Sequence, residues 1–372
     1  MAKRLVLCFD GTWNSNDSGG SETNVARIAR AVHGTRGDDG LQQITLYLRG
    51  VGSTGIALQR LVGGAFGEGV DDNIRSGYMF LAQNYVPGDS IYLFGFSRGA
   101  YTARSLSGLI GSCGLLMRQK LGDLAKAWEY YRTTPPRTAD AFCQRYGTEC
   151  HSTVTIAFLG VWDTVGSLGI PGTMLNQVVA RDYQFHDTTP SAIIERGRHA
   201  LAIDEHRDEF EPTLWTGATP PGCDIKQVWF AGAHSDVGGG YRDRRLADIP
   251  LLWMAEEAAA AGLRLDFGVL RDATGDPDPC APQHESRQSW SRKDRLTPTI
   301  RQVMGRTPEI GLLERLYRPM DQDGNALLPI GESLHPSVLA RFGKQVRLLA
   351  GDEDGTGAAM PYRPKNLVPP LA

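Results

Sequence analysis

The sequence lacks an apolar run long enough to cross a membrane. A spanning helix needs about 20 consecutive, predominantly apolar residues, and no such run occurs in the 372 residues. The N-terminal residues also lack a secretory hydrophobic region followed by a cleavage site. We therefore expect membrane contact to be peripheral at most. We expect the cytoplasm of the producing cell as the location, and export outside the general secretory pathway stays open.

An excess of basic charge is also missing. Lys and Arg together number 39, Asp and Glu number 42, and the formal net charge is −3. Because nucleic-acid binding depends on cationic groups that neutralise phosphates, this balance argues against a general nucleic-acid binder.

Cysteine is scarce and scattered. The chain has six cysteines, and no two of them form a Cys-x-x-Cys pair. Cys8 and Cys113 lie in apolar segments, which is typical of small core residues. This usage favours a reducing compartment and leaves a bridge between Cys143 and Cys150 open. We expect neither a cofactor nor a resident metal ion.

The chain does contain short apolar runs that alternate with helical patterns. Strands are predicted at 5–9, 44–48, 91–94, 154–161 and 228–231, and helices at 25–32, 70–85, 121–132 and 250–261. A segment at 192–203 is also interpreted as helical. Strands alternating with helices predict a mostly parallel sheet with helices on both faces, the α/β class.

No internal repeat or linker divides the sequence. We expect one domain over 1–372, with a core at about 5–263 and a loop-rich C-terminal extension at 264–372 packed on that core. The stretch 169–190 has little periodicity and is interpreted as a lid or insert.

The most informative stretch of the sequence surrounds Ser97. A turn at 87–89 precedes the apolar run at 91–94, and Gly95-Phe96-Ser97-Arg98-Gly99 then leads into a segment with helical spacing. The order strand, Gly-x-Ser-x-Gly, helix is typical of a nucleophile elbow. There the glycines allow a sharp turn and the serine adopts a strained conformation.

Polar residues also follow three other predicted strands. Asp10, Asp163 and His234 come directly after the runs at 5–9, 154–161 and 228–231. In an open parallel sheet such strand ends meet at one edge, where ligands bind. The order Ser97, Asp163, His234 is that of an α/β-hydrolase triad, in which the histidine accepts the serine proton and the aspartate orients the imidazole. Asp236 is the rival acid.

Further residues are assigned supporting roles. The N–H of Arg98, with that of Gly11 or Thr12, is predicted to form the oxyanion hole. Asp10 and Asp204 are candidates for residues that support the site. His199, Glu205 and Arg207 are interpreted with Asp204 as a charged cluster that is surface-exposed or supports the site, and His335 as structural.

Two rival chemistries can be weighed on the same residues. The stretch 8–12 resembles the Asp-x-Asp-Gly-Thr motif of haloacid-dehalogenase-type phosphatases, but Cys8 stands where the nucleophilic aspartate is required. A metal-dependent hydrolase using Asp10, Asp163, His234 and Asp236 is the second rival. Oxygen-rich sites suit Mg²⁺ or Ca²⁺, although no ligand spacing of a recognised kind occurs.

The motifs at 9–14, 95–104, 162–166 and 234–241, with a further stretch at 199–215, together resemble one family. It is the α/β-hydrolase domain of the first class of type VI secretion lipase effectors, and the resemblance spans about 5–263. It implies an α/β-hydrolase-like fold and a serine esterase or lipase, with phospholipase A activity as one form. Ser97 is then the nucleophile, His234 the base, and Asp163 is preferred over Asp236 as the acid.

The chain departs from the large effectors of this family in being short. A soluble esterase acting on small esters is therefore an alternative to a lipid-cleaving enzyme. A catalytically weak binding module on a hydrolase fold is another. The expected partner is a lipid or small ester substrate, and an immunity or secretion partner is left open.

Overall fold

The computed structural model describes the chain in segments with gaps: residues 2–11, 21–34, 39–50, 66–133, 136–166, 188–271, 276–289, 296–321, 323–350, 357 and 359–367. The predicted lid at 169–190 lies almost entirely outside these residues, and so does Thr12.

A seven-stranded sheet forms the centre of the described structure, and each of its neighbouring pairs is parallel. The spatial order is β12-β8-β7-β6-β3-β1-β2. The strands are β1 (Lys3–Phe9), β2 (Gln42–Leu48), β3 (Ser90–Phe96), β6 (Ile156–Trp162), β7 (Arg196–Ala202), β8 (Asp224–Phe230) and β12 (Glu332–Leu334).

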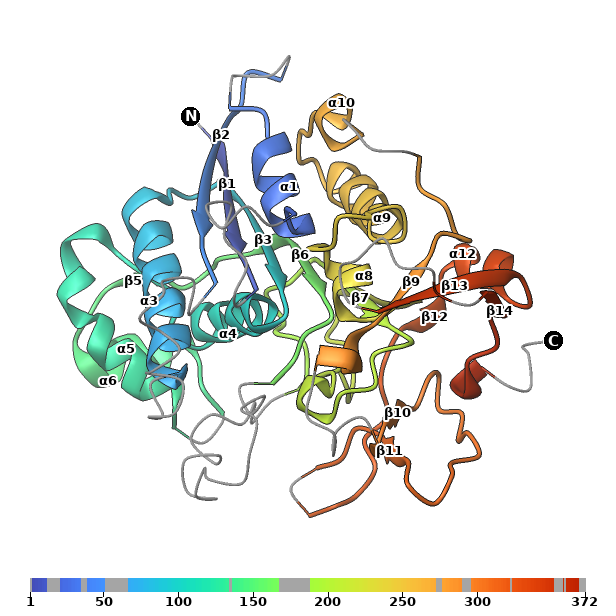
Figure 1. The fold of residues 1–372 in the computed structure, drawn as a ribbon. Coiled ribbons are helices and arrows are strands. Elements are labelled where there is room, and N and C mark those ends of the chain that lie inside the picture. The colour runs from blue at the N-terminus through green and yellow to red at the C-terminus, as the bar shows by residue number, and fades with distance from the viewer. Residues whose placement is uncertain are drawn as a thin grey trace.

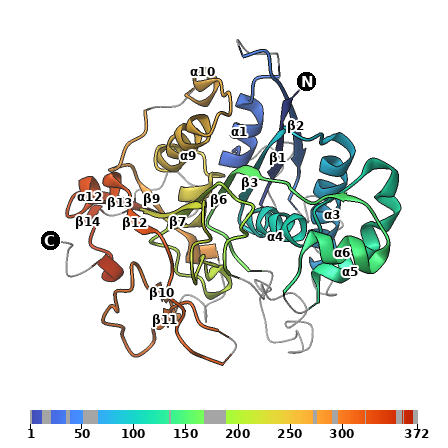
Figure 2. The same ribbon diagram turned by 180° about the vertical axis from the view of Figure 1, so that it is seen from behind.

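Helices cover both faces of this sheet (Figures 1 and 2). In β1, Leu5, Leu7 and Phe9 pack into one apolar cluster, whereas Val6 and Cys8 pack into the other. This period of two is expected for a strand buried on both faces. The first cluster includes residues of α3 (Phe66–Asn84), α4 (Arg98–Cys113), α5 (Leu124–Tyr131) and α6 (Ala139–Tyr146), and the second those of α1 (Asn24–Ala31), α9 (Asp248–Ala260) and α10 (Phe267–Leu270). The predicted α/β class is confirmed.

Local capping signals fix the ends of two helices, α1, which the sequence predicts, and α6, which it does not. Thr23 caps α1 by accepting a hydrogen bond from the N–H of Ala26 at 3.1 Å. Thr138 caps α6 in the same way through Ala141, and Gly147 ends that helix in the left-handed conformation. A side-chain oxygen at the cap satisfies one of the free N–H groups of a first turn.

The helix predicted at 192–203 is wrong, because this stretch contains β7. The segment is rich in Ala and Arg, which favour helices in isolation. In the fold it lies between β6 and β8, where the sheet's hydrogen bonds and burial on both faces outweigh that local preference. The charge of the buried Arg198 is balanced there by Glu257 and Asp224.

The C-terminal segment is more than loops. It supplies the edge strand β12 and α12 (Pro336–Arg341), and its Val303, Val338 and Leu367 pack against Leu201 and Trp229 of the central sheet. Two small sheets join it, one of β10 (Thr299–Arg301) and β11 (Arg315–Tyr317), the other of β9 (Gln283–Glu285), β13 (Gln345–Ala350) and β14 (Ala359–Pro361).

Two further features bear on the sequence predictions. The helices of the described segments include none that is both long and apolar enough to cross a bilayer. The six cysteines are free thiols, including Cys143 at α6 and Cys150 of β5 (Cys150–His151), which pairs with β4 (Leu115–Leu116).

Candidate active site

Ser97 lies at the turn between β3 and α4 with a strained backbone. Its φ of 57° and ψ of −123° fall outside the regions that L-residues usually occupy. Such conformations cost energy, and they persist only where the surrounding structure enforces them. The turn also lies at the point of the sheet where the strand order reverses, because β3 is adjacent to β1 while β2 lies on the far side of β1. In open α/β sheets this reversal is the usual ligand site.

The two glycines of the motif are required by close contacts between backbones. A Cβ atom on Gly95 would lie 2.4 Å from the carbonyl oxygen of Gly99 at the start of α4. A Cβ on Gly99 would lie 2.1 Å from the carbonyl oxygen of Phe9 and 2.6 Å from that of Asp10. The absence of side chains therefore lets α4 begin directly against the ends of β1 and β3, and this packing forces the turn at Ser97.

Replacing Gly99 by Ala should destabilise the fold severely. The added methyl group collides with backbone that cannot move without separating β1 from α4, so we expect a loss above about 3 kcal/mol in the free energy of unfolding. Urea denaturation followed by circular dichroism measures it. Gly122→Ala is the control, because a Cβ there meets nothing within 4 Å, and we expect a change within about 0.5 kcal/mol. Equal midpoints for the two variants would contradict the packing argument.

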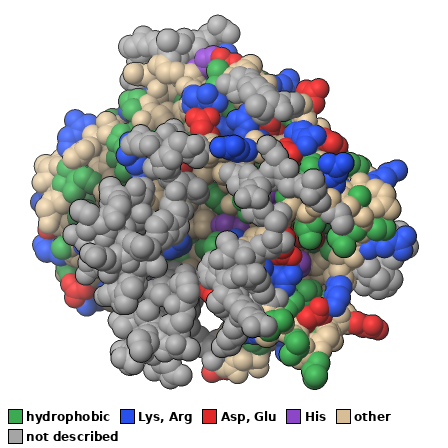
Figure 3. All heavy atoms as spheres, in the orientation of Figure 1, with side chains coloured by type: hydrophobic (Ala, Val, Ile, Leu, Met, Phe, Trp, Pro, Cys, Tyr) green, Lys and Arg blue, Asp and Glu red, His purple; other side chains and the backbone are tan. Residues whose placement is uncertain are grey.

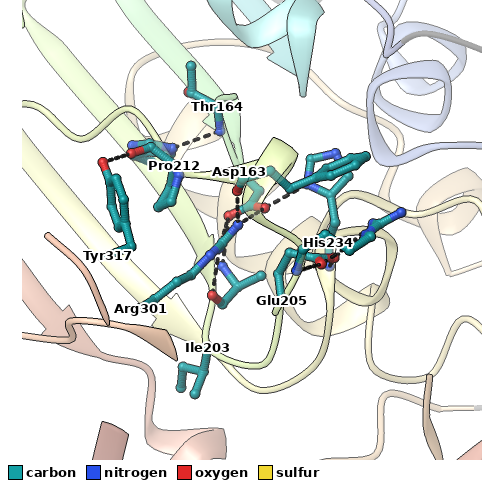
Figure 4. Close-up of polar contacts among 12 residues, drawn as sticks. Asp163, Thr164, Ile203, Glu205, Pro212, His234, Arg301 and Tyr317 are labelled. Carbon is teal, nitrogen blue, oxygen red and sulfur yellow. Dashed lines mark hydrogen bonds and ion pairs between the residues drawn. The ribbon is translucent and has the colours of Figure 1, made fainter. Parts of the chain in front are cut away.

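Asp163 and His234 meet at the same edge of the sheet. Phe96 pairs with Trp162 in register, so Ser97 and Asp163 leave neighbouring strand ends together, and the Ser97 N–H donates to the Trp162 carbonyl at 3.0 Å. His234 begins the short helix α8 (His234–Gly238) after β8. Its Nδ1 lies 2.6 Å from Asp163 Oδ2 (Figure 4), and both side chains are buried.

His234 is enclosed by aromatic rings, one of which precedes Ser97. The Phe96 ring lies 4.5 Å from the imidazole, centroid to centroid, and the Phe210 ring lies 4.7 Å away edge-on. Phe96 thus places His234 beside the elbow. The Ser97 hydroxyl forms no hydrogen bond with another described residue, and its pairing with His234 stays a prediction. Figure 3 shows one face of the molecule, on which hydrophobic, charged and histidine side chains are interspersed.

The charge around Asp163 is set by Arg301. Burial alone would raise the pKa of Asp163, but the Arg301 guanidinium and the hydrogen bond from His234 outweigh it and hold this pKa well below its usual range. Arg301 Nη1 lies 2.7 Å from Oδ1, and Nη2 lies 3.1 Å from Oδ2. An ionised carboxylate can only accept hydrogen bonds. The His234 proton must therefore reside on Nδ1, which leaves Nε2 as the basic nitrogen.

His234 should give activity an acidic limb below neutral pH. Burial lowers the pKa of His234, and the neighbouring Asp163 and Glu205 carboxylates only partly oppose this effect. Because a general base must be unprotonated, we expect kcat/KM on a soluble ester to be constant above about pH 6.5 and to fall below it. A pH profile on p-nitrophenyl acetate measures the limb. A midpoint above pH 7 would contradict the assignment of burial as the dominant effect.

Asp236, the rival acid, is engaged elsewhere. Its Oδ1 lies 2.6 Å from Nδ1 of His284, and its Oδ2 accepts from the N–H groups of His284 and Ala233 at 3.0 Å each. The His284 ring in turn stacks on Tyr241 at 3.7 Å. These contacts tie the first turn of α8 to β9, so Asp236 anchors the helix that carries His234 while Asp163 contacts the imidazole.

Of the residues predicted for the oxyanion hole, the described ones, Arg98 and Gly11, follow the neighbouring strands β3 and β1. Arg98 is the first residue of α4, where main-chain N–H groups point out of the helix. The Gly11 N–H donates to Asp10 Oδ1 at 2.7 Å. Asp10 is fixed through Oδ2 by the hydroxyls of Tyr47 at 2.5 Å and Thr23 at 2.8 Å. Burial raises the pKa of Asp10 to about 6, although these three hydrogen bonds oppose the shift.

The charged cluster predicted from the sequence is mostly buried. Asp204 is buried, and His199 and Glu205 have no exposed surface. His199 Nε2 accepts from the Thr164 N–H at 3.1 Å and its Nδ1 lies 3.2 Å from Gln227 Oε1. Burial lowers its pKa to about 3, so His199 is a neutral residue that fixes the turn after Asp163.

Glu205 and Asp204 hold the loops around α8. Glu205 Oε2 accepts from the His234 N–H at 3.2 Å, and its carboxylate forms a two-pronged pair with Arg207. Asp204 Oδ2 accepts from the Gly232 N–H and the Tyr362 hydroxyl. Burial raises the pKa of Asp204 to about 6 despite these hydrogen bonds.

Sequence reasoning missed Arg301, Phe210 and His284. Arg301 lies 138 positions from Asp163, in the C-terminal extension at 264–372 that the sequence predicts to be rich in loops. No local pattern indicates that its guanidinium is buried.

The donors proposed for a metal site do not gather. In the part of the chain that the structure describes, no three His, Cys, Asp or Glu side chains are placed to hold a metal ion. Asp163 faces Arg301 and Asp236 faces His284 instead.

Comparisons of sequence and structure relate the chain to known proteins. An uncharacterised protein of Saccharomyces cerevisiae, YEL023C, is 32% identical over 238 residues, which is 58% of this chain and 33% of that protein. An uncharacterised protein from Pseudomonas aeruginosa has a solved structure with a TM-score of 0.41 and 20% identity, covering 73% of this chain and 48% of the other. The Tle1 effector bound to the VgrG spike from the type 6 secretion system gives 0.39 and 18%, covering 65% and 51%.

The chain thus spans a third of the yeast relative and about half of each solved chain. The family described as T6SS phospholipase effector Tle1-like, catalytic domain, matches residues 3–257. Because this match covers well over half of the chain, the protein belongs to the Tle1-like phospholipase effector family by its catalytic domain.

Proposed function

We propose that this protein is a serine hydrolase that cleaves carboxylic ester bonds of lipids, with Ser97 as nucleophile, His234 as general base and Asp163 as the acid of the triad. The observation that carries the proposal is the 2.6 Å contact between His234 Nδ1 and the buried Asp163 carboxylate, one strand end away from the strained turn at Ser97. A buried acid–imidazole pair beside a nucleophile elbow suits acyl transfer.

The first half-reaction forms an acyl-enzyme. His234 Nε2 takes the proton of the Ser97 hydroxyl as Oγ attacks the ester carbonyl, and the imidazolium is stabilised by Asp163. The carbonyl oxygen becomes an oxyanion, for which the Arg98 N–H at the start of α4 is the first donor. When the C–O bond to the leaving alcohol breaks, the imidazolium transfers its proton to that alcohol, and Ser97 remains as an ester.

Hydrolysis of the acyl-enzyme repeats these steps with water. His234 Nε2 accepts a proton from water as the water oxygen attacks the acyl carbonyl. The proton then passes from His234 to Ser97 Oγ as the fatty acid leaves. Each proton that His234 accepts is thus returned, and Asp163 stays ionised throughout.

Membership of a phospholipase effector family supports a lipid as the acyl donor. We therefore propose a phospholipase-type activity on glycerophospholipid esters, with hydrolysis of small soluble esters as the alternative.

Two measurements test the proposal. A fluorophosphonate probe should label the protein at Ser97, and labelling should not depend on added chelator. Release of fatty acid from phosphatidylcholine and phosphatidylglycerol vesicles is then compared with turnover of p-nitrophenyl esters of increasing chain length. Faster turnover of vesicles supports the lipid substrate, and activity confined to short esters supports the soluble esterase. Absence of labelling together with chelator-sensitive activity would overturn the serine mechanism.

A further inference from the structure

Arg301 is a fully buried arginine whose guanidinium contacts three separate parts of the site. Nη1 donates to Asp163 Oδ1 and to the Ala202 carbonyl, each at 2.7 Å, and Nη2 reaches Asp163 Oδ2 at 3.1 Å and the Phe210 carbonyl at 2.6 Å. Figure 4 shows the guanidinium and His234 approaching Asp163 from different directions. We propose that Arg301 is a positioning residue for the triad, and that the C-terminal segment carrying it completes the active site.

The contacts on Asp163 fix the orientation of its carboxylate. Oδ1 accepts from Arg301 and from the Ala202 N–H at 3.0 Å, while Oδ2 accepts from Arg301 and His234. Two parallel bonds from one guanidinium hold a carboxylate in one plane. Rotation of Asp163 away from His234 would break both, so Arg301 keeps Oδ2 directed at Nδ1.

The same guanidinium also fixes a wall of the histidine pocket. It binds the carbonyl of Phe210, whose ring packs edge-on against His234 at 4.7 Å. Arg207 lies 3.6 Å above the centroid of that ring and pairs with Glu205, which accepts from the His234 N–H. Arg301 therefore supports His234 through the acid on one side and through Phe210 on the other.

Arg301 is held in place by residues of the C-terminal segment. The Asn366 side chain donates to the carbonyls of both Arg301 and Ile203 at 3.2 and 3.0 Å. The neighbouring Thr299 N–H donates to the His206 carbonyl at 2.8 Å. Arg301 lies beyond residue 257, where the family match ends. The catalytic unit of this chain therefore extends past the matched region.

The inference rests on the proposed function, and its test separates the two. Fluorophosphonate labelling of the wild-type chain at Ser97 is established first, because its absence counts against the triad and not against Arg301 alone. The variants Arg301→Met and Arg301→Lys are then compared with Arg341→Met. Arg341 is equally buried and lies in the same segment, but it binds Pro279, Ala281 and Gln283 and packs on the Tyr362 ring, and none of these is a triad residue.

We expect Arg301→Met to lower kcat/KM on a soluble ester about 10- to 100-fold, by analogy with residues that orient the histidine ligands of metal sites. KM should change little. The groups facing the pair are His199, Glu205, Arg207 and Arg301 itself. Removing the Arg301 charge raises the pKa of Asp163 and lets the carboxylate hold a proton on His234 more strongly. Both effects shift the acidic limb of the pH profile to higher pH.

Arg301→Lys keeps the positive charge but lacks the two parallel hydrogen bonds. The acidic limb of its pH profile should stay near that of the wild type, while part of the loss in kcat/KM remains. This variant decides the matter if Arg301→Met does not fold, as judged by thermal unfolding. Arg341→Met should lose stability with its acidic limb unmoved. The inference is overturned if the Arg301 variant that folds has a wild-type rate and limb, or if it matches Arg341→Met.

Discussion

Ser97→Ala should abolish labelling by a fluorophosphonate and lower kcat on a soluble ester about 10⁴- to 10⁶-fold, the range found when a triad nucleophile is removed. Among the described residues, Ser97 is the only one with a side-chain hydroxyl and a positive φ. We therefore expect no neighbouring hydroxyl to replace it as nucleophile. Alanine removes one oxygen atom and leaves the turn, its two glycines and the contacts of α4 unchanged.

A serine on the same helix provides the matched control. The Ser107 hydroxyl donates to the Arg104 carbonyl within α4, and its replacement by Ala should leave labelling intact and the rate within a few-fold of wild type. Both variants should unfold close to the wild-type temperature. If Ser97→Ala retains labelling or more than about a tenth of the wild-type rate, the serine mechanism is wrong and the fold hosts other chemistry.

Asp163→Asn should lower kcat about 10⁴-fold, by analogy with the corresponding change in a serine protease triad. An amide donates a hydrogen bond to Nδ1 and so favours the tautomer that has its proton on Nε2, where no proton can then be accepted from Ser97. The substitution also leaves the Arg301 charge buried without its carboxylate partner, which costs about 3 to 5 kcal/mol in the free energy of unfolding.

The rival acid supplies the comparison. Asp236→Asn disturbs the hydrogen bonds with His284 and the cap of α8, and we expect a loss of stability with a fall in kcat of at most about 100-fold. Folding of each variant is followed by thermal unfolding, and kcat is measured below the onset. A larger loss of kcat for Asp236→Asn than for Asp163→Asn would reverse the assignment of the acid.

The Asp163 carboxylate also links stability to pH. Its pKa in the folded protein is depressed, so the stabilisation is present above the pKa of about 4 that an unfolded aspartate has and is lost as the pH falls toward the folded value. Burial acts in the opposite direction on Asp10 and Asp204 and raises the pKa of each to about 6. Their effect is therefore to lower the stability of the fold as the pH rises from about 4, the pKa of an unfolded aspartate, to about 6. The variants at position 163 are therefore best compared at one pH, above 7.

By itself the sequence determined the features that depend on neighbours along the chain. The apolar runs ending in Asp10, Ser97, Asp163 and His234 indicate buried strands, and Gly-x-Ser-x-Gly between a strand and a helix indicates the elbow. The motif can be recognised in the sequence because Gly95 and Gly99 flank Ser97, and parallel strands bring their ends to one edge whatever the loops contain. The contact of Gly99 with Phe9 and Asp10 follows only from the fold.

Only the tertiary structure decided how these groups pair. The sequence favours Asp163 and keeps Asp236 as its rival, but only the fold shows that Asp163 contacts His234 Nδ1 and that Asp236 contacts His284. The 192–203 segment has local helical preference yet becomes β7, because two neighbouring strands satisfy its backbone. Arg301 joins the site from 138 residues away. Ion pairing and burial depend on distances in space. The order of residues along the chain does not indicate which distant groups the fold brings into contact.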